Sequence, residues 1–453
     1  MKNTIYKILA LSILLISGCS DEFLEKKPDK SLVVPTTLED MQALLDNADR
    51  VMNIVPAIGM IASDDAFTTS NGWKSLLTAT ERNSYIWALD TYNGEACSDW
   101  NIPYQQVFYA NVVLDGLNNI VETSANETQW KNIKGSALFF RAHALHQLAE
   151  HFTMPYDQSN AETELGVPVR LTADINAEVK RSLLTETYRQ IMDDLKVALP
   201  LLPATSMYKT RPTATAAKAL LARIHLSMNQ YEEAESYASQ SLNDNSFLID
   251  YNNLKPADAR PVPRMNDEIL FHAQMITYSY VVFATTYVDT LLYASYAQDD
   301  LRKDIFFRQR STNRYTFKAN YTGSTPLFGG IANDEVYLIR AECRARLNNV
   351  SGALEDLNTL LQKRWKAGTY IPVTENDSQA LLEIILAERR KELLFRTTRW
   401  SDLRRLNRES NFAVTLSRTI NDTEYRLPAG DLRYAFPIPP QEIQNSGIEQ
   451  NPR

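Results

Sequence analysis

Along most of the chain, hydrophobic residues recur every three or four positions, the spacing that places them on one face of an α-helix. The helices predicted from this period span 38–48, 103–122, 127–151, 183–199, 213–228, 231–243, 333–347, 350–364, 379–396 and 399–407. Alternation of period two, which is typical of strands, is confined to 269–275, 281–289 and 313–319. The pattern predicts a mainly α-helical fold with few short strands.

Two of the predicted helix pairs repeat one another. Residues 216–242 align without gaps with residues 335–361, and Ala234 matches Ala353 where the second helix begins to pack on the first. A helix, a short polar turn and a second helix with a small residue at the crossing form the pattern of a tetratricopeptide-type hairpin. A weaker relative lies at 136–151. Because the units are far apart in sequence, we expect a compact helical scaffold rather than a regular solenoid.

These features predict one domain of tetratricopeptide-like units interrupted by two insertions. The domain spans 38–453, and its helical units lie near 127–151, 213–243 and 333–364. The insertions, 60–101 and 271–328, lack the helical period and are rich in aromatic residues. Long insertions on a rigid scaffold are where binding residues tend to lie.

The aromatic residues of the insertions are candidates for binding a sugar. A Trp or Tyr ring can pack against the apolar C–H face of a pyranose, while its polar edge and a nearby carboxylate take the hydroxyl groups. Burial in the core or at a partner interface is the alternative interpretation of each ring. The predicted ligand-binding residues are Trp73, Trp87, Tyr92, Tyr278, Tyr280, Tyr287 and Tyr296, with Asp64 and Asp65 beside them.

Composition supports the helical prediction and limits the ligand. The chain of 453 residues has only 14 Gly, about half of the roughly 7% expected, which suits long helices and disfavours Gly-rich nucleotide loops. It has 22 Tyr and 6 Trp, a rich supply of half-polar rings. A net charge of −8 excludes an extended basic surface for nucleic acid. The same charge disfavours a strongly anionic ligand, although it leaves a local basic pocket open.

The first eighteen residues predict a secretory signal peptide. Lys2 and Lys7 give a positive start, and residues 8–16 form an apolar run. This run fits the hydrophobic region of a signal peptide and is too short for a membrane span, which takes about 20 residues.

Residues 16–19 read Ile-Ser-Gly-Cys and resemble a bacterial lipobox, in which the cysteine becomes the lipidated first residue. The acidic segment 20–22 resembles the surface-export signal of lipoproteins in Bacteroidetes-type bacteria. We therefore expect a lipid on Cys19, a tether over 19–37 and an outer-membrane, surface-exposed location. An ordinary signal peptide with an incidental cysteine is the alternative.

Several motifs, in this order, resemble those of the SusD/RagB family of outer-membrane nutrient-binding lipoproteins. No single motif is specific, but their common order over nearly the whole chain is. They are the Phe-Phe-Arg-Ala segment at 139–142 leading to Pro155-Tyr156, ALLAR at 219–223, YLIRAE at 337–342, ERRKEL at 388–393 with RWSDLR at 399–404, and the end at 438–443 and 450–452. The chain departs from the family pattern at 395–398, where Phe-Arg-Thr-Thr replaces a Phe-Glu-Gly-type turn.

The resemblance implies a helical scaffold and a binding function without catalysis. It implies capture of an oligosaccharide and its delivery to a SusC-like TonB-dependent transporter, over which the lipoprotein sits as a lid. The RagB branch of the family leaves an oligopeptide ligand as the alternative. A surface glycoside hydrolase is a third hypothesis, although adjacent acids such as Asp64-Asp65 do not provide the two carboxylates that a glycosidase places across a cleft. GxSxG, GxGxxG, P-loop and HExxH motifs of other enzyme classes are absent from the sequence. No cofactor is expected.

Two polar clusters allow either a functional or a structural interpretation. Residues 388–405 collect arginines and carboxylates that could form an anion site, but a partly buried ion-pair network that clamps the last helices is the favoured interpretation. His143, His146 and Glu150 share one helical face and could hold a metal. Their apolar neighbours favour a hydrogen-bonded histidine pair in the core, so no metal site is predicted.

Beyond Cys19, the sequence has only Cys97 and Cys343. Two cysteines cannot form a disulfide framework or, unaided, a structural zinc site. The helical pattern around Cys343 predicts a small buried side chain, and a bridge between the two is left open.

Overall fold

The computed structural model describes residues 35–453. The predicted signal peptide 1–18, the predicted lipidation site Cys19 and all but the end of the tether lie outside the described residues. None of the helices described is both long and apolar enough to cross a bilayer.

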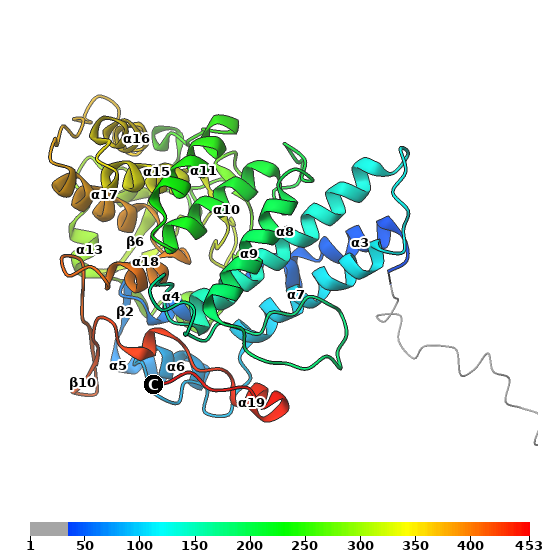
Figure 1. Ribbon diagram of the computed structural model, residues 1–453. Coiled ribbons are helices and arrows are strands. Elements are labelled where there is room, and N and C mark those ends of the chain that lie inside the picture. The colour runs from blue at the N-terminus through cyan, green and yellow to red at the C-terminus, as the bar shows by residue number, and fades with distance from the viewer. Residues whose placement is uncertain (1–34) are drawn as a thin grey trace, which may run out of the picture.

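The predicted mainly α-helical fold is confirmed, and a helix lies in each of the ten predicted ranges (Figure 1). Most boundaries fall within two residues of the prediction. The exceptions are α3, which ends three residues early, α7, which begins and ends five residues early and keeps Pro103 inside it, and α17, which ends four residues early. The helices are α3 (Leu38–Leu45), α7 (Ser98–Leu117), α8 (Glu127–Phe152), α9 (Leu184–Ala198), α10 (Ala214–Ser227), α11 (Tyr231–Asp244), α15 (Asn333–Arg346), α16 (Val350–Gln362), α17 (Ser378–Glu392) and α18 (Thr398–Leu406).

The helical hairpins pack against one another although long segments separate them in sequence. α7 packs on α8, α8 on α9, α10 on α11 and α15 on α16, and α11 packs on α15 (Figure 1). The two repeat units are therefore neighbours in space. Arg223 of α10 joins them by donating from Nε and Nη2 to the Glu335 carboxylate of α15, at 2.7 and 2.6 Å.

A second buried arginine ties the earlier helices together. Arg141 of α8 donates to both carboxylate oxygens of Asp194 on α9, at 2.7 and 2.6 Å, and to Asn111 Oδ1 on α7 at 2.9 Å. Such forked contacts fix both distance and orientation, so the Arg-Ala motif of α8 sets how three helices meet.

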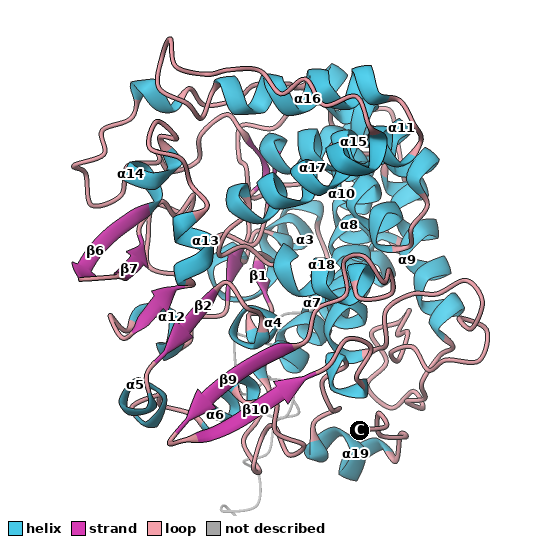
Figure 2. Ribbon diagram, turned by 90° about the vertical axis from the view of Figure 1, so that its left-hand side faces the viewer, coloured by secondary structure: helices cyan, strands magenta, loops and turns pink. Residues whose placement is uncertain are grey.

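The strands of the described residues form short two-stranded ladders, most of them along one side of the helical body (Figure 2). β2 (Ala66–Thr68) pairs antiparallel with β5 (Thr286–Val288), with Phe67 opposite Tyr287. This pairing brings the two predicted insertions together. The others are β1 (Ile54–Val55) with β4 (Gln274–Met275), β3 (Ile269–Phe271) with β8 (Ile331–Ala332), β6 (Phe307–Ser311) with β7 (Arg314–Phe317), and β9 (Leu416–Ile420) with β10 (Thr423–Leu427).

The insertions contain short helices that the periodicity did not predict. Thr78 and Glu81 form a capping box at the start of α6, and the Glu81 carboxylate also accepts hydrogen bonds from Ser279 Oγ and the Tyr280 N–H. Glu81 thus joins the first insertion to the second. These helices, with one near the C-terminus, are α4 (Ile58–Ala62), α5 (Ser70–Lys74), α6 (Ala79–Tyr85), α12 (Ser279–Val282), α13 (Thr290–Ala294), α14 (Arg302–Phe306) and α19 (Pro440–Ser446).

Cys97 and Cys343 are both buried free thiols, so no disulfide joins them. The predicted buried position of Cys343 is confirmed.

Candidate functional site

Four of the predicted ligand-binding rings lie in the core. Trp87, Tyr92, Tyr280 and Tyr296 are each at most 4% exposed. Their polar atoms donate to main-chain carbonyls at 2.7 to 3.1 Å, those of Ala62, Pro437, Ala66 and Lys391 respectively. These four rings present no face to solvent, and the structure corrects their predicted binding role to one in packing.

The remaining three rings are half-buried. Trp73 Nε1 donates to the Arg82 carbonyl at 2.9 Å, and Tyr278 OH donates to Asp99 Oδ2 at 2.5 Å. Tyr287 packs against Phe67 with 5.7 Å between ring centroids. Among the described residues no ring contact joins these three rings into one platform. A binding role for them stays a prediction.

Asp64 and Asp65 face arginines rather than an open ligand site. Arg399 of α18 donates to both Asp64 oxygens at 2.6 and 2.8 Å, and Arg390 Nε of α17 donates to Asp65 at 3.1 Å. Burial raises the pKa of Asp65 to about 6, whereas for Asp64 the two guanidiniums outweigh burial and lower the pKa. The structure thus assigns both residues to ion pairs that anchor the first insertion on the last helices.

The structural interpretation of segment 388–405 is confirmed. Arg405 donates to both Glu342 oxygens at 2.5 and 2.7 Å and to Asp402, and Arg389 Nε donates to Asp402 at 2.9 Å. Most partners of the charged residues in segment 388–405 come from elsewhere in the chain, such as Glu342 of α15. The fold brings these partners close although they are distant in sequence.

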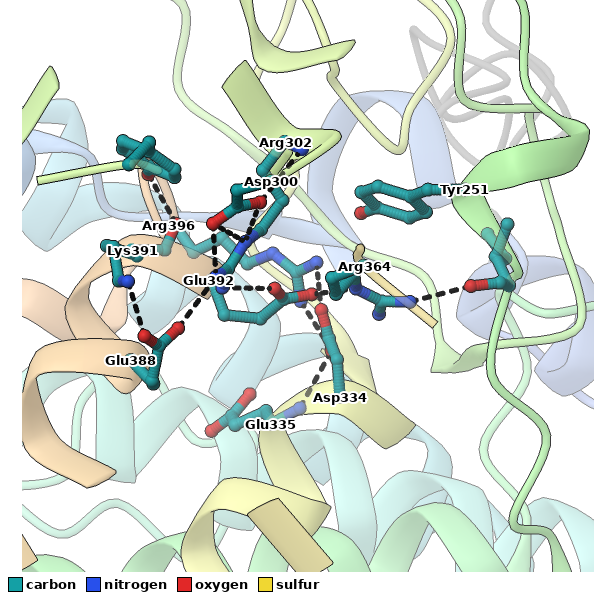
Figure 3. Close-up of polar contacts among 12 residues, drawn as sticks. Tyr251, Asp300, Arg302, Asp334, Glu335, Arg364, Glu388, Lys391, Glu392 and Arg396 are labelled. Carbon is teal, nitrogen blue, oxygen red and sulfur yellow. Dashed lines mark hydrogen bonds and ion pairs between the residues drawn. The ribbon is translucent and has the colours of Figure 1, made fainter. Parts of the chain in front are cut away.

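Glu388, Glu392 and Arg396 of this segment belong to a buried ionic network that extends to other parts of the chain (Figure 3). Arg302 contacts the carboxylates of Asp300, Glu388 and Glu392 at 2.6 to 3.0 Å. Arg364 bridges Glu392 and Glu268, both at 2.6 Å. Arg396 donates to both oxygens of Asp334 at 3.0 and 2.6 Å. We call these eight residues the arginine network.

The arginine network includes three carboxylates close enough to share a cation. Oxygens of Glu268, Asp334 and Glu392 lie within 4.8 Å of one another. Each already accepts from Arg302, Arg364 or Arg396, whose positive charges face the space a cation would need. The cluster is therefore explained as ion pairing. Burial also raises the pKa of Glu268 to about 7.

The histidine pair differs from the expectation. Burial lowers the pKa of His143 to about 3 and that of His146 to about 4, and neither ring makes a hydrogen bond to a protein atom. His143 stacks on Phe139, and His146 Nε2 lies 3.9 Å from Glu150 Oε1. The pair is buried in the core as predicted but not hydrogen-bonded as predicted.

Most of the lining of an open pocket of about 470 Å³, within the range of small-molecule sites, comes from the second insertion. The walls of this pocket come from residues 259–260, the segment 281–286, the β6–β7 hairpin and the loop 320–327, and Phe395 also lines it. We call it the insertion pocket. Its lining residues are Ala259, Arg260, Val281, Val282, Phe283, Ala284, Thr286, Arg308, Arg310, Thr316, Phe317, Lys318, Asn320, Ser324, Thr325, Leu327 and Phe395.

The arginine network supports one wall of the insertion pocket. Phe395 lies in a left-handed backbone conformation, with φ of 57°, and packs on Phe317 at 5.1 Å between centroids. The next residue, Arg396, is held by Asp334 and lies 4.2 Å from the ring centre of Tyr321. Phe395, which the family pattern shares, thus lines the insertion pocket, and the departure at the next position places Arg396 in the core.

None of the nine residues predicted to bind ligand lines the insertion pocket. One sequence signal could have found it. Residues 305–328 contain four cationic residues and no carboxylate, in a chain whose net charge is negative.

Two family profiles match the sequence. One, described as "Starch-binding associating with outer membrane", matches residues 22–226, and one described as "SusD family" matches residues 334–453. The chain belongs to the SusD family. A search of curated protein sequences finds no match.

Solved SusD-family structures share the fold over almost the whole chain. A SusD superfamily protein from Bacteroides thetaiotaomicron is 22% identical, with a TM-score of 0.73 over 92% of this chain and 100% of that one. One from Bacteroides fragilis is 20% identical, with a TM-score of 0.71 over 91% and 98%. A SusD-like carbohydrate binding protein from Bacteroides vulgatus is 19% identical, with a TM-score of 0.67 over 91% and 97%.

Proposed function

We propose that this SusD-family chain is a non-catalytic lipoprotein of the cell surface that binds an oligosaccharide and delivers it to a SusC-like TonB-dependent transporter. The observation that carries the proposal is the insertion pocket, a concave site of ligand size on the scaffold that the family profiles identify. The likeness to a structure described as a carbohydrate binding protein supports the ligand class.

The character of the pocket lining supports binding without hydrolysis. A glycosidase places two carboxyl groups about 5 to 9.5 Å apart across the scissile bond. The described lining of the insertion pocket contains no Asp or Glu. Of the acid pairs in the sequence, Asp64 and Asp65 are ion-paired and Asp300 is buried against Arg302.

A lipid on Cys19 would keep the protein at the transporter between delivery cycles. With the tether 19–37 attached to the membrane, rebinding becomes intramolecular, and its effective concentration depends on the tether length. A lipidated full chain should fractionate with outer membranes, and Cys19→Ala should release it. Retention of the Cys19→Ala variant would contradict lipid anchoring.

Two measurements test the proposal. Titration calorimetry of the purified protein against pools of neutral glycans, acidic glycans and oligopeptides should give saturable heat with a glycan pool. Affinity purification of the tagged protein from solubilised outer membranes should recover a large transporter. Saturable binding of peptides alone would replace the proposal with the oligopeptide alternative, and recovery of the protein without a transporter would contradict delivery.

Hydrolysis needs a separate assay. Incubation of the protein with the glycans it binds should release no reducing ends. Release that is lost on substitution of a carboxylate would establish a glycoside hydrolase instead.

A further inference from the structure

We propose that the insertion pocket binds the carboxylate or sulfate groups of an acidic oligosaccharide. This inference rests on the proposed function and narrows its ligand class. The four cationic side chains Arg260, Arg308, Arg310 and Lys318 line one concave surface that has no acidic lining residue. A concave surface lined by one sign of charge concentrates ions of the opposite sign.

The pocket cations have no carboxylate partners. No Asp or Glu oxygen of the described chain lies within 4 Å of their charged nitrogens, whereas each arginine of the arginine network contacts at least one carboxylate. Unpaired cations at a protein surface remain available to an anionic ligand. This is the main difference between the pocket and the ionic clusters of the core.

Neutral contacts position the pocket cations without cancelling their charge. Arg260 Nη1 donates to the Gly323 carbonyl at 3.0 Å, and Arg310 Nε donates to Thr316 Oγ1 at 3.0 Å. Lys318 donates to the Pro256 carbonyl. Burial and repulsion from the nearby Arg308 lower the pKa of Lys318, although the more distant Asp304 and Asp258 act in the opposite direction. An anionic group between them would relieve this repulsion.

The rest of the lining suits a sugar ring. Val281, Phe283 and Phe317 offer apolar surface for C–H faces, and the exposed Thr325 offers a hydroxyl group. A neutral oligosaccharide would use these groups but would leave the guanidinium groups without an ionic partner. An acidic oligosaccharide uses both kinds of surface.

Arg308→Gln is the sharpest variant, because the Arg308 side chain is exposed on β6 and its guanidinium makes no hydrogen bond or ion pair with the described residues. Its removal takes away one charge-assisted contact, so affinity for a uronate-containing oligosaccharide should fall about tenfold or more. Arg308→Lys should retain part of the affinity. The matched control is Arg426→Gln on the exposed β9–β10 hairpin, outside the pocket, which should leave affinity unchanged.

Calorimetry with matched probes separates this inference from the proposed function. The probes are one uronate oligosaccharide, the same oligosaccharide after reduction of its carboxyl groups, a sulfated oligosaccharide and an oligoglutamate peptide. We expect binding of a charged sugar that weakens with salt and on carboxyl reduction. The inference would be overturned if the uronate oligosaccharide and its carboxyl-reduced form bind equally well and the sulfated oligosaccharide binds no better. The proposed function would then still hold.

The other outcomes are equally decisive. Absence of binding to any sugar would overturn both the inference and the proposed function. Binding of oligoglutamate as tightly as the uronate probe would overturn the sugar assignment. A charged-sugar affinity that Arg308→Gln leaves intact would overturn the location. Unfolding curves of each variant confirm that a lost affinity does not reflect a lost fold.

Discussion

The arginine network and the insertion pocket lie on either side of the turn at Phe395, and arginine side chains have opposite surroundings in the two regions. In the network, Arg302 and Arg364 are fully buried and each contacts two or more carboxylates. In the pocket, Arg308 and Arg310 are exposed and contact none. The arginines of the network are paired with carboxylates of the protein itself. The arginines of the pocket have no such partner and remain available to an anionic ligand.

This difference separates stability from binding. Removing one partner of a buried ion pair leaves an uncompensated charge in the core and is strongly destabilising. Removing an exposed cation without partners changes stability little. Network residues should therefore control whether the protein folds, and pocket residues should control what it binds.

The largest effect should come from Arg302→Met. Arg302 contacts Asp300, Glu388 and Glu392, so its loss leaves three carboxylates without their common cation. We expect a loss of about 3–5 kcal/mol in the free energy of unfolding, measured by urea denaturation. The matched control, Arg308→Met in the pocket, should lose less than about 0.5 kcal/mol. Equal losses would remove the distinction between the two regions.

Glu342→Gln should show a pH-dependent effect. Burial alone would raise the pKa of Glu342, but Arg405 and Arg346 outweigh it and hold the pKa at about 2, below its ordinary value of 4.5. An acid with a lowered folded-state pKa stabilises the fold above its unfolded pKa and loses this contribution as the pH falls toward the folded value.

At pH 7 the loss on Glu342→Gln should be about 3 kcal/mol, and it should shrink as the pH falls below about 4.5. Urea denaturation of both proteins at pH 7 and at pH 3.5 measures this difference. Glu383→Gln, at an exposed position of α17, is the control and should change stability by less than about 0.5 kcal/mol at either pH. A penalty that does not vary with pH would show that packing, not charge, explains it.

Asn320→Ala should moderately reduce both the stability of the protein and its affinity for ligand. Asn320 Nδ2 donates to the Ser324 carbonyl at 3.0 Å, and its Oδ1 accepts from the Phe328 N–H at 3.0 Å, so it shapes the loop that forms one pocket wall. We expect a loss of about 1–2 kcal/mol in unfolding free energy together with weaker ligand binding. Unfolding and calorimetry on one sample test this. Weaker binding without any loss of stability would place Asn320 in direct contact with ligand instead.

The scaffold could be predicted from the sequence because helices follow local patterns. The period of 3.6 identified all ten long helices, and the repeat identified two hairpins. The pairing of α11 with α15 could not be predicted, because about ninety residues separate them. The β9–β10 hairpin left a weaker signal: Ile420 is followed directly by Asn421-Asp422, both of which adopt positive φ.

The site was less predictable, because composition does not show which way a side chain points. Tyr92 lies in an aromatic-rich stretch, but its hydroxyl bonds the Pro437 carbonyl, 345 residues away. Likewise, Asp64 sits next to Asp65 in sequence, and only the fold brings Arg399 to it. The acid-free segment 305–328 was the one local signal of the pocket, and net charge averaged over the whole chain concealed it.

The smallest expected effect tests most directly whether the pocket cations carry an unbalanced positive charge. If the pocket cations repel one another, Arg308→Gln should raise the free energy of unfolding by a few tenths of a kcal/mol at low ionic strength, because Lys318 loses a like-charged neighbour. In 1 M salt, where the Debye length is about 3 Å, the gain should vanish. Arg426→Gln, at an exposed position near Glu424, should show no such gain. A gain that persists in 1 M salt, or a loss at low salt, would mean that the pocket cations do not carry an unbalanced charge and that the two regions differ only in burial.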